Sequence, residues 1–317
     1  MASPATRVGR WQGGGSVVSI RQFDPAAIAE LFALAADIQA RPGDVADLAR
    51  GRLMATLFYE PSTRTRLSFE AAMARLGGQI ISTENAASMS SAVKGESLED
   101  TVRIVSGYAD VIVLRHHDAG SARTAASVVD VPVLNAGDGP GEHPTQALLD
   151  AYTIERRVGR LDHLRVALVG DMAYGRTAHS LSLLLANYPG QRITFIAPDV
   201  ARAPAALVAE LSASGAEVEE SEDFLGAVGA CDVLYMTRVQ KERFPSLELY
   251  ERAQGRFSLD ARAMAALAPA AWILHPLPRL AELPEAVDND PRAIYFEQAR
   301  NGVPIRMALL ARALSLA

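Results

Sequence analysis

The residues from 62 to 66 carry the strongest chemical signal in the sequence. They crowd hydroxyl and guanidinium groups between an apolar run at 52–60 and a helical pattern at 66–78: Ser62, Thr63, Arg64, Thr65 and Arg66. Free backbone N–H groups and the helix dipole attract anions at a helix start, and arginine binds phosphate through paired hydrogen bonds. A capped helix with solvated arginines would explain the same residues. Such a row of donors favours a phosphate site, although the Walker pattern GxxxxGK[ST] is absent.

Polar side chains also follow other apolar runs in the first half of the chain. Arg115 stands at the end of a predicted strand over 110–116, and His143 and Gln146 lie one turn apart at the start of a helical pattern. His143 and Gln146 could both donate hydrogen bonds toward a polarised carbonyl oxygen. Taken singly, Arg115 is equally well explained as solvated, and His143 is better explained as a helix cap. Lys94 stands in a polar loop, where a solvated lysine is the default.

The second half places nitrogen donors after apolar strands in the same way. Arg176 follows the run at 165–171, Arg238 and Gln240 follow the run at 232–237, and HPLPR (275–279) follows another. A pair such as Arg238 with Gln240 suits a carboxylate. The pattern GxGxxG is absent, which disfavours a dinucleotide. Since one half suits phosphate and the other carboxylates, we expect a reaction that joins a phosphorylated donor to a carboxylated acceptor.

Alternating strand and helix patterns must position these residues. Strands are predicted at 52–60, 78–83, 110–116, 131–137, 165–171, 192–198, 216–221, 232–239 and 271–276, with helices at 24–40, 66–78, 143–159, 176–188, 203–214, 259–267 and 295–316. This alternation predicts an α/β fold with two consecutive doubly wound parallel-sheet domains, divided within the helix near 145–155. Because ligands bind at the carboxyl ends of parallel strands, an active-site cleft is expected between the domains.

The composition of the chain disfavours several classes of protein. The 317 residues carry a net charge of −6, which argues against a nucleic-acid partner. No apolar stretch reaches the roughly 18 residues that span a bilayer. Residues 1–17 lack the apolar core of a secretory signal and are predicted to form a loose tail. The single cysteine, Cys231, is expected to pack in a buried strand, which fits a reducing cytoplasm. Neither HExxH nor a metal-type spacing of Cys, His and Asp is present, so no metal is predicted.

Longer motifs run from about Val18 to the C-terminus. In order they are FYEPSTRTRLSFE (58–70), SSAVKGESLEDT (90–101), HPTQALLD (143–150), GDMAYGRTAHS (170–180), TRVQKERF (237–244), HPLPR (275–279) and YFEQARNGVPIRMALL (295–310). This succession closely resembles the catalytic chains of aspartate carbamoyltransferases. The ornithine-specific branch of that superfamily shares the phosphate block but usually carries a Cys-containing motif in place of HPLPR, so the resemblance favours the aspartate branch.

The resemblance implies a domain organisation and a reaction. A carbamoyl phosphate domain would cover 18–145 together with the C-terminal helix, about 301–317, and an aspartate domain would cover 146–300. The enzyme would transfer the carbamoyl group of carbamoyl phosphate to the α-amine of L-aspartate in pyrimidine biosynthesis. The family's reaction needs no covalent intermediate, metal or redox cofactor. A cytoplasmic homotrimer with shared active sites is also implied, with neither membrane nor nucleic acid as partner.

The same resemblance implies roles for individual residues. Carbamoyl phosphate would be bound by Ser62, Thr63, Arg64, Thr65, Arg115, His143 and Gln146, with Ser90 and Lys94 reaching in from a neighbouring subunit. Of these, Arg64, Thr65, Lys94, Arg115 and His143 would be the catalytic set, with Arg64 and His143 polarising the carbonyl group. Aspartate would be bound by Arg176, Arg238, Gln240, Leu277 and Pro278. Two acids, Glu242 and Glu282, would orient Arg238.

The sequence departs from the family pattern at three places. Ala173 stands where lysine is frequent, Ala281 stands where aspartate is common, and RHHD (115–118) replaces an Arg-His pair followed soon by proline. The first two lie in the acceptor half and leave open a paralogous carbamoyltransferase that acts on a different amine or amino acid. A catalytically inactive scaffold is the third reading. It predicts damage at the catalytic positions, yet the expected residues stand at Arg64, Lys94, Arg115 and His143.

Overall fold

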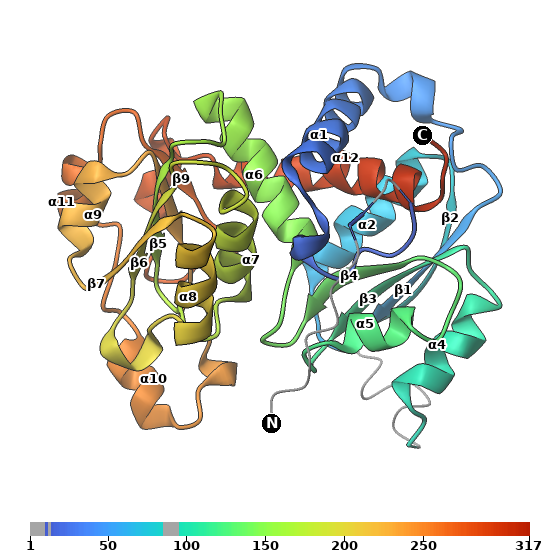
Figure 1. Ribbon diagram of the computed structural model, residues 1–317, viewed down its shortest axis with the longest axis horizontal. Coiled ribbons are helices and arrows are strands. Elements are labelled where there is room, and N and C mark those ends of the chain that lie inside the picture. The colour runs from blue at the N-terminus through green and yellow to red at the C-terminus, as the bar shows by residue number, and fades with distance from the viewer. Residues whose placement is uncertain (1–9, 12–13, 85–94) are drawn as a thin grey trace. The chain divides into compact units, whose positions relative to one another are not determined.

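The chain folds into two α/β units that each contain one parallel sheet. The computed structural model describes residues 10–11, 14–84 and 95–317. Unit 1 comprises the residues up to Thr145 together with Gly302–Ala317, and unit 2 comprises Gln146–Asn301. The division therefore falls inside two helices, α6 (Pro144–Val158) and α12 (Tyr295–Ala313) (Figure 1). The prediction of two successive parallel α/β sheets is confirmed.

Unit 1 is built on the strand order β2-β1-β3-β4. The strands are β1 (Leu53–Phe58), β2 (Gln79–Glu84), β3 (Val111–His116) and β4 (Val133–Asp138), and every neighbouring pair is parallel. Helices α4 (Leu98–Ser106) and α5 (Ser121–Ala126) cover one face, where Val102 and Ala122 pack against Ile112 and Leu114. Helices α1 (Pro25–Ala40) and α2 (Thr63–Arg75) lie on the other face with the end of α12 (Figure 1).

Unit 2 has the strand order β7-β6-β5-β8-β9, again with every pair parallel. The strands are β5 (Arg165–Val169), β6 (Arg192–Ile196), β7 (Glu217–Ser221), β8 (Val233–Met236) and β9 (Trp272–Leu274). Helices α7 (Arg176–Leu185) and α8 (Ala205–Ala213) cover one face of this sheet, while α9 (Phe224–Ala230) and α11 (Ala261–Ala266) cover the other (Figure 1). Helix α10 (Leu247–Ala253) completes the unit.

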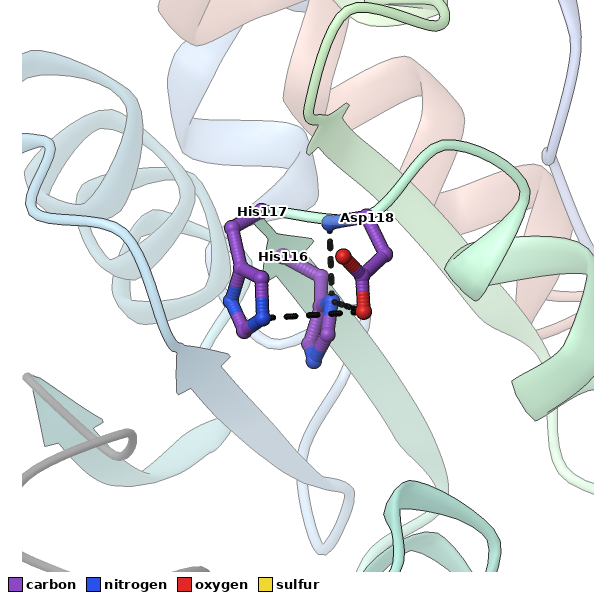
Figure 2. A group of neighbouring side chains, drawn as sticks. All are labelled: His116, His117 and Asp118. Atoms are coloured by element: carbon purple, nitrogen blue, oxygen red, sulfur yellow. Dashed lines mark hydrogen bonds and ion pairs between the residues drawn. The ribbon is translucent and has the colours of Figure 1, made fainter. Parts of the chain in front are cut away.

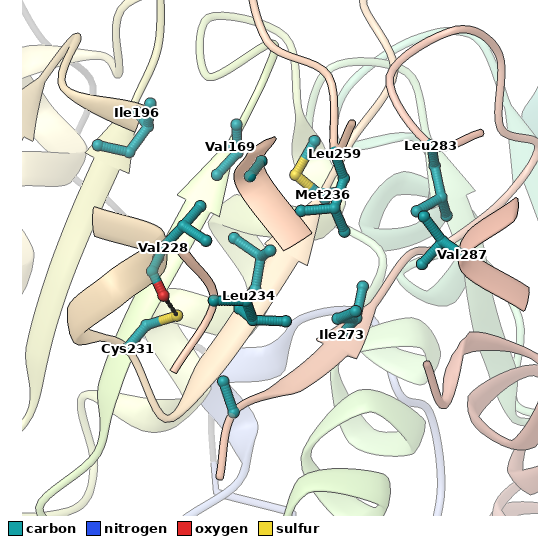
Figure 3. Packing of buried hydrophobic residues seen from close by; sticks show 14 of the residues in the cluster. Val169, Ile196, Val228, Cys231, Leu234, Met236, Leu259, Ile273, Leu283 and Val287 are labelled. Carbon is teal, nitrogen blue, oxygen red and sulfur yellow. Dashed lines mark hydrogen bonds between the residues drawn. The ribbon is translucent and has the colours of Figure 1, made fainter. Parts of the chain in front are cut away.

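The core of unit 2 explains its long apolar runs. Figure 3 shows Val169, Leu234 and Met236 of the central strands packed against Val228 of α9. Because helices cover both faces, a central strand has no solvated side, so its sequence is continuously apolar instead of alternating. Cys231 is buried in this core, as expected, but it caps the end of α9 two residues before β8 instead of lying in a strand, and its thiol is directed at the Val228 carbonyl at 3.6 Å.

Several short helices complete the chain, and some helices were not predicted. The 3-10 helices are η1 (Ile20–Gln22), η2 (Pro42–Val45), η4 (Asp199–Ala201), η5 (Lys241–Arg243) and η6 (Glu285–Asn289). Helices α4, α5, α9 and α10 were missed because each is short, between 6 and 9 residues, and carries at most about two and a half turns of pattern. Among the described residues, no helix is long and apolar enough to cross a membrane.

The segment predicted to be a loose tail is partly packed against unit 1. Trp11 is buried and its ring lies against Phe23, with 4.9 Å between ring centroids. The Val17 N–H donates to the Val133 carbonyl at 2.9 Å, which adds a short parallel bridge to the edge of β4. The prediction of a loose segment is therefore wrong for these residues. Apolar Trp11 and Val17 were the available signal, because each gains by burial.

Candidate active site

The predicted donors of unit 1 gather where the sheet changes direction. Strands β1 and β3 are neighbours, and the connections after them lead to opposite sides of the sheet, which makes the gap between their carboxyl ends the natural ligand position. Ser62 is the N-cap of α2 and stands in the short connection that follows β1. Arg115 lies near the end of β3, in register with Phe58 of β1. The fold therefore brings these two motifs to one edge, although they are far apart in the sequence.

The start of α2 has the features of an anion site. Ser62 is extended, with φ −160° and ψ 90°, and its hydroxyl makes no capping bond to the helix. No acidic residue occupies the first turn, so nothing on the helix itself offsets the positive end of its dipole. Thr63 and Arg64 are exposed, whereas Thr65 is buried. The helix begins at Thr63, earlier than the predicted 66, which places residues 63–65 in its first turn.

Arg66 differs from its neighbours in what it contacts. Its guanidinium group lies 2.9 Å from the Glu84 carboxylate and donates to the Ser82 hydroxyl at 3.2 Å. Both partners belong to β2, so Arg66 ties α2 to the edge strand. The row of donors noticed in the sequence therefore divides into residues 62–65 at the helix start and one arginine with a structural role.

Arg115 is held in place by its own unit. Its side chain is 13% exposed, one terminal nitrogen lies 3.3 Å from the Glu60 carboxylate, and the other donates to the Ala136 carbonyl at 3.3 Å. An arginine that is mostly buried and oriented by two acceptors loses little freedom when it binds an anion. This contradicts the simple alternative of a solvated arginine.

His143 lies in the connection between β4 and α6 and is buried, with 3% of its surface exposed. The preceding turn is closed by Asp138, whose carboxylate accepts the Glu142 N–H at 2.6 Å and the Gly120 N–H at 2.8 Å. Gly139 has φ +55°, and a Cβ there would stand 2.0 Å from the His117 carbonyl oxygen. Only glycine fits this turn, which fixes the direction from which His143 enters.

The other anchor of this turn is Glu142, which bonds to the N-terminal segment. Its carboxylate accepts the Ser19 hydroxyl at 2.8 Å and the Ile20 N–H at 2.7 Å. The Arg21 guanidinium group lies at 2.5 Å from the same carboxylate. Residues more than 120 positions away therefore hold the backbone beside His143.

Three residues of the RHHD departure form a compact cluster at the end of β3, shown in Figure 2. In the described part of the chain, His116, His117 and Asp118 can each offer a ligand atom within 4.8 Å of one another. The imidazole rings are stacked, with 4.1 Å between centroids and 24° between planes, so their in-plane lone pairs do not converge on one ion. The Asp118 N–H also donates to His116 Nδ1 at 3.1 Å. The contacts of this cluster therefore suit a role in stabilising the loop better than a metal site.

Unit 2 has its own change of direction, between β5 and β8. Asp171 follows β5 and is fully buried, and its carboxylate accepts the Tyr174 N–H at 2.9 Å and the Gln240 N–H at 3.3 Å. Burial raises the pKa of Asp171 to about 6, although the backbone donors favour its ionised form. This carboxylate ties the loop after β5 to the loop after β8.

Three of the predicted acceptor residues lie on these two loops or at the helix start that directly follows one of them. Arg176 is buried at the first position of α7. Arg238 is paired with Glu242, as predicted, and the two groups form a bidentate contact with one arm of 3.2 Å. Burial opposes ionisation of Glu242, but the bond from Arg238 prevails and lowers the pKa of this carboxyl. Gln240 donates its amide to the Tyr174 carbonyl at 3.2 Å.

The predicted HPLPR segment forms a bend after β9. Leu277 has φ +53° and is followed by a cis bond to Pro278. Its N–H donates to His275 Nδ1 at 2.8 Å, and His275 Nε2 lies 3.0 Å from the Glu282 carboxylate. Glu282 was expected beside Arg238. In the structure its carboxylate bonds to His275 and to the Leu280 N–H at 2.8 Å, because the bend folds back over its own chain.

The remaining predicted residues divide into two groups. Ser90 and Lys94 lie outside the described residues. Gln146 lies in the first turn of α6, where its amide donates to the Asp150 carboxylate at 2.8 Å. The sequence reasoning missed the acids that organise the site, namely Asp138, Glu142, Asp150 and Asp171. For Asp171 a signal existed, because it directly follows the apolar run of β5.

Both halves of the chain match a known family. Residues 16–156 match the family model for the carbamoyl-P binding domain of aspartate/ornithine carbamoyltransferases, and residues 162–313 match the model for the Asp/Orn binding domain. The chain belongs to the aspartate/ornithine carbamoyltransferase family. The resemblance seen in its motifs is thereby confirmed, and the chain is similar along most of its length to several members of this family.

The relatives and solved structures agree on the branch. The chain is 53% identical over 304 residues to the chloroplastic aspartate carbamoyltransferase of Oryza sativa, covering 93% of this chain and 84% of that protein. It is 48% identical to the aspartate carbamoyltransferase catalytic subunit of Thermococcus onnurineus, covering 94% and 96%. A Trypanosoma cruzi aspartate transcarbamoylase solved with carbamoyl phosphate and aspartate matches with a TM-score of 0.89 at 40% identity, covering 95% and 97%.

Proposed function

We propose that the chain transfers the carbamoyl group of carbamoyl phosphate to the α-amine of L-aspartate, giving N-carbamoyl-L-aspartate and phosphate for pyrimidine biosynthesis. The observation that carries this proposal is the start of α2. There an N-cap hydroxyl that makes no capping bond and residues 63–65 lie at the switch point of a sheet whose family model is named for carbamoyl phosphate. The named relatives and the T. cruzi complex support aspartate as the acceptor.

Carbamoyl phosphate belongs, in this proposal, to a domain formed by 18–145 and about 301–317. The hydroxyl groups and helix N–H groups of Ser62, Thr63 and Thr65 bind the phosphate, with Arg64 as its charged partner. Arg115, His143 and Gln146 contact the carbamoyl end. Charge-assisted bonds of this kind are stronger than neutral ones, so the two arginines supply most of the binding energy.

Aspartate belongs to the domain formed by 146–300. Arg176, Arg238 and Gln240 bind its two carboxylates, and the backbone at Leu277 and Pro278 orients the molecule. The Arg238–Glu242 pair supports this role, because an arginine already oriented by one carboxylate loses less side-chain entropy on meeting another. Asp171 joins the loops that carry Arg176 and Gln240.

The reaction consists of one displacement with balanced proton transfer. The uncharged α-amine attacks the carbamoyl carbon, a C–N bond forms, and negative charge develops on the carbonyl oxygen beside Arg64 and His143. The C–O bond to phosphate then breaks, and the leaving phosphate accepts the amine proton. Alignment of the two reactants can supply about 7–11 kcal/mol. A single donor to the developing oxyanion supplies about 3–4 kcal/mol.

Steady-state assays of carbamoyl phosphate with a panel of amines test the proposal. We expect turnover with L-aspartate and at least a hundredfold lower kcat/KM with L-ornithine, L-glutamate and putrescine. Turnover with another amine in the absence of turnover with L-aspartate would assign the chain to a different acceptor, as the alanines at 173 and 281 first suggested.

A homotrimer with shared active sites is part of the same proposal. Strand β2 lies at the edge of the unit 1 sheet, and Ile81 on it is 39% exposed, while Leu67 on α2 is 50% exposed. Exposed apolar side chains at a sheet edge are typical of surfaces that meet another copy of a chain. Ser90 and Lys94, which follow β2 in the sequence, would then enter a neighbouring site.

Sedimentation and mixing experiments test this assembly. We expect a trimer mass, and we expect mixed oligomers of Lys94→Ala and His143→Ala chains to recover part of the activity that each lacks. A monomer, or properly mixed oligomers without recovery, would contradict shared sites. We also propose a reducing compartment such as the cytoplasm, which the buried thiol of Cys231 supports.

A further inference from the structure

Asp150 is a buried carboxylate at which several side chains of unit 2 meet. It lies on α6 and is 0% exposed. One oxygen accepts the Gln146 amide at 2.8 Å and the Gln298 amide at 2.6 Å, and the other accepts the Tyr235 hydroxyl at 2.7 Å. Burial and the charge of Asp150 raise the pKa of Tyr235, which keeps its hydroxyl a donor.

The first consequence concerns the orientation of Gln146. The Gln146 side-chain nitrogen donates to Asp150, so the NH2 group of Gln146, and not its oxygen, faces this carboxyl group. The side-chain oxygen of Gln146 is then directed elsewhere as an acceptor. Among the groups of carbamoyl phosphate, only the NH2 can donate to such an oxygen. The oxygen would give Gln146 an acceptor role toward the substrate, beside the donor role expected from the sequence.

The second consequence concerns the bend at 275–280. The Gln298 amide that donates to Asp150 also accepts the His275 N–H on its oxygen, at 2.9 Å. The His275 ring in turn accepts the Leu277 N–H and contacts Glu282. A continuous chain of hydrogen bonds therefore runs from Asp150 through Gln298 and His275 to the backbone at Leu277.

We propose that Asp150 is a positioning residue for both substrates: it turns the Gln146 oxygen toward the carbamoyl NH2, and through Gln298 it fixes the bend that holds aspartate. This inference rests on the proposed function, because Gln146 and Leu277 are substrate contacts only if that function is correct. It makes Asp150 a specificity determinant, since acetyl phosphate has a methyl group where carbamoyl phosphate has NH2.

The experiment compares carbamoyl phosphate with acetyl phosphate as donors to L-aspartate. In Asp150→Ala we expect the ratio of the two kcat/KM values to fall about tenfold, the effect of one lost hydrogen bond, because the Gln146 amide can then rotate. We also expect the KM for aspartate to rise about tenfold. Asp150→Asn can keep an oxygen toward Gln146 and Gln298 while the Tyr235 hydroxyl rotates to accept, so it should retain the ratio within about threefold.

Two further variants distinguish the effect through Gln146, the effect through Gln298 and a general loss of stability. Gln298→Met should raise the KM for aspartate about tenfold and leave the donor ratio unchanged. Thr153→Val is the matched control, because it breaks the bond from Asn301 to Thr153 (2.9 Å) between the same two helices, one turn away. It should lower the melting temperature without changing either kinetic readout.

The outcomes decide between positioning and mere stability. A folded Asp150→Ala with an unchanged ratio and unchanged KM for aspartate overturns the proposal, and so does Thr153→Val with the same kinetic changes as Asp150→Ala. Should Asp150→Ala not fold, the double variant Asp150→Leu with Tyr235→Phe replaces it, since it removes the acceptor of both glutamine amides together with the Tyr235 hydroxyl, and the same two outcomes apply. Wild-type turnover of carbamoyl phosphate with aspartate is measured first, so failure of the proposed function is seen separately.

Discussion

The two candidate half-sites are organised differently. In unit 1 the proposed phosphate donors are consecutive residues at one helix start, whose first turn has no acidic residue. In unit 2 the proposed carboxylate donors come from distant segments, and intramolecular acceptors already engage them, as in the Arg238–Glu242 and Gln240–Tyr174 contacts. If these assignments are correct, the proposed phosphate half is preformed by local structure, whereas the proposed acceptor half is assembled by contacts between loops.

The largest expected effect is at the preformed half. Arg64→Ala should reduce kcat by about 10²–10³, because it removes a donor to the developing oxyanion while the exposed position tolerates alanine. Arg66→Ala is the matched control. Its guanidinium group is committed to Glu84 and Ser82, so we expect a small loss of stability and kcat within about threefold of wild type.

Kinetics with both variants also test whether Arg64 acts on the substrate while its neighbour Arg66 has only a structural role. Equal loss of kcat in the two would mean that residues 62–66 act as one unit, and the division drawn from the contacts of Arg66 would be wrong.

A smaller effect is expected at the assembled half. Arg238→Ala should lower kcat/KM for aspartate about 10- to 100-fold, as for a lost charged hydrogen bond, and should leave the KM for carbamoyl phosphate unchanged. Glu242→Gln should act in the same direction but more weakly, because it only loosens Arg238. An equal rise in both KM values would show that Arg238 does not discriminate between the substrates.

Asp171 makes the assembled half sensitive to pH. Below its pKa of about 6 the carboxyl is protonated and accepts the Tyr174 and Gln240 N–H groups less well. We therefore expect kcat/KM for aspartate to fall below about pH 6, and Asp171→Asn to flatten that limb. If kcat/KM for aspartate falls below pH 6 in Asp171→Asn as it does in the wild type, the titrating group is not Asp171.

Stability should move in the opposite direction over the same range. The folded-state pKa, about 6, lies above the ordinary value of 3.8, so the folded protein holds this proton more tightly than the unfolded chain. The contribution of Asp171 to the free energy of unfolding thus increases as pH falls from 6 toward 4, by about 3 kcal/mol for the difference of 6 − 3.8. The difference between wild type and Asp171→Asn, measured by denaturant unfolding at pH 4 and 8, checks the sign.

The same contrast explains what the sequence could predict. The α2 site was predictable because its residues are adjacent and the helix start supplies the anion chemistry. Asp150 was not, since its role depends on Gln298, 148 residues away, and on Tyr235, 85 residues away. Helix α4 was missed although Ser97 caps it and Glu99 and Asp100 occupy its first turn. These signals were overlooked because the segment was interpreted as part of a polar loop. Capping residues deserve weight when a helix is short.

The smallest expected effect tests whether the preformed half is entirely local. Glu142 links the turn before His143 to residues 19–21, so Glu142→Gln should remove the ion pair with Arg21 and weaken one further bond. We expect a loss of about 1 kcal/mol in the free energy of unfolding, with kcat within about threefold, because the Asp138 bonds still close the turn. A large loss of kcat without loss of stability would show that His143 depends on this distant segment, and the two half-sites would then be assembled in the same way.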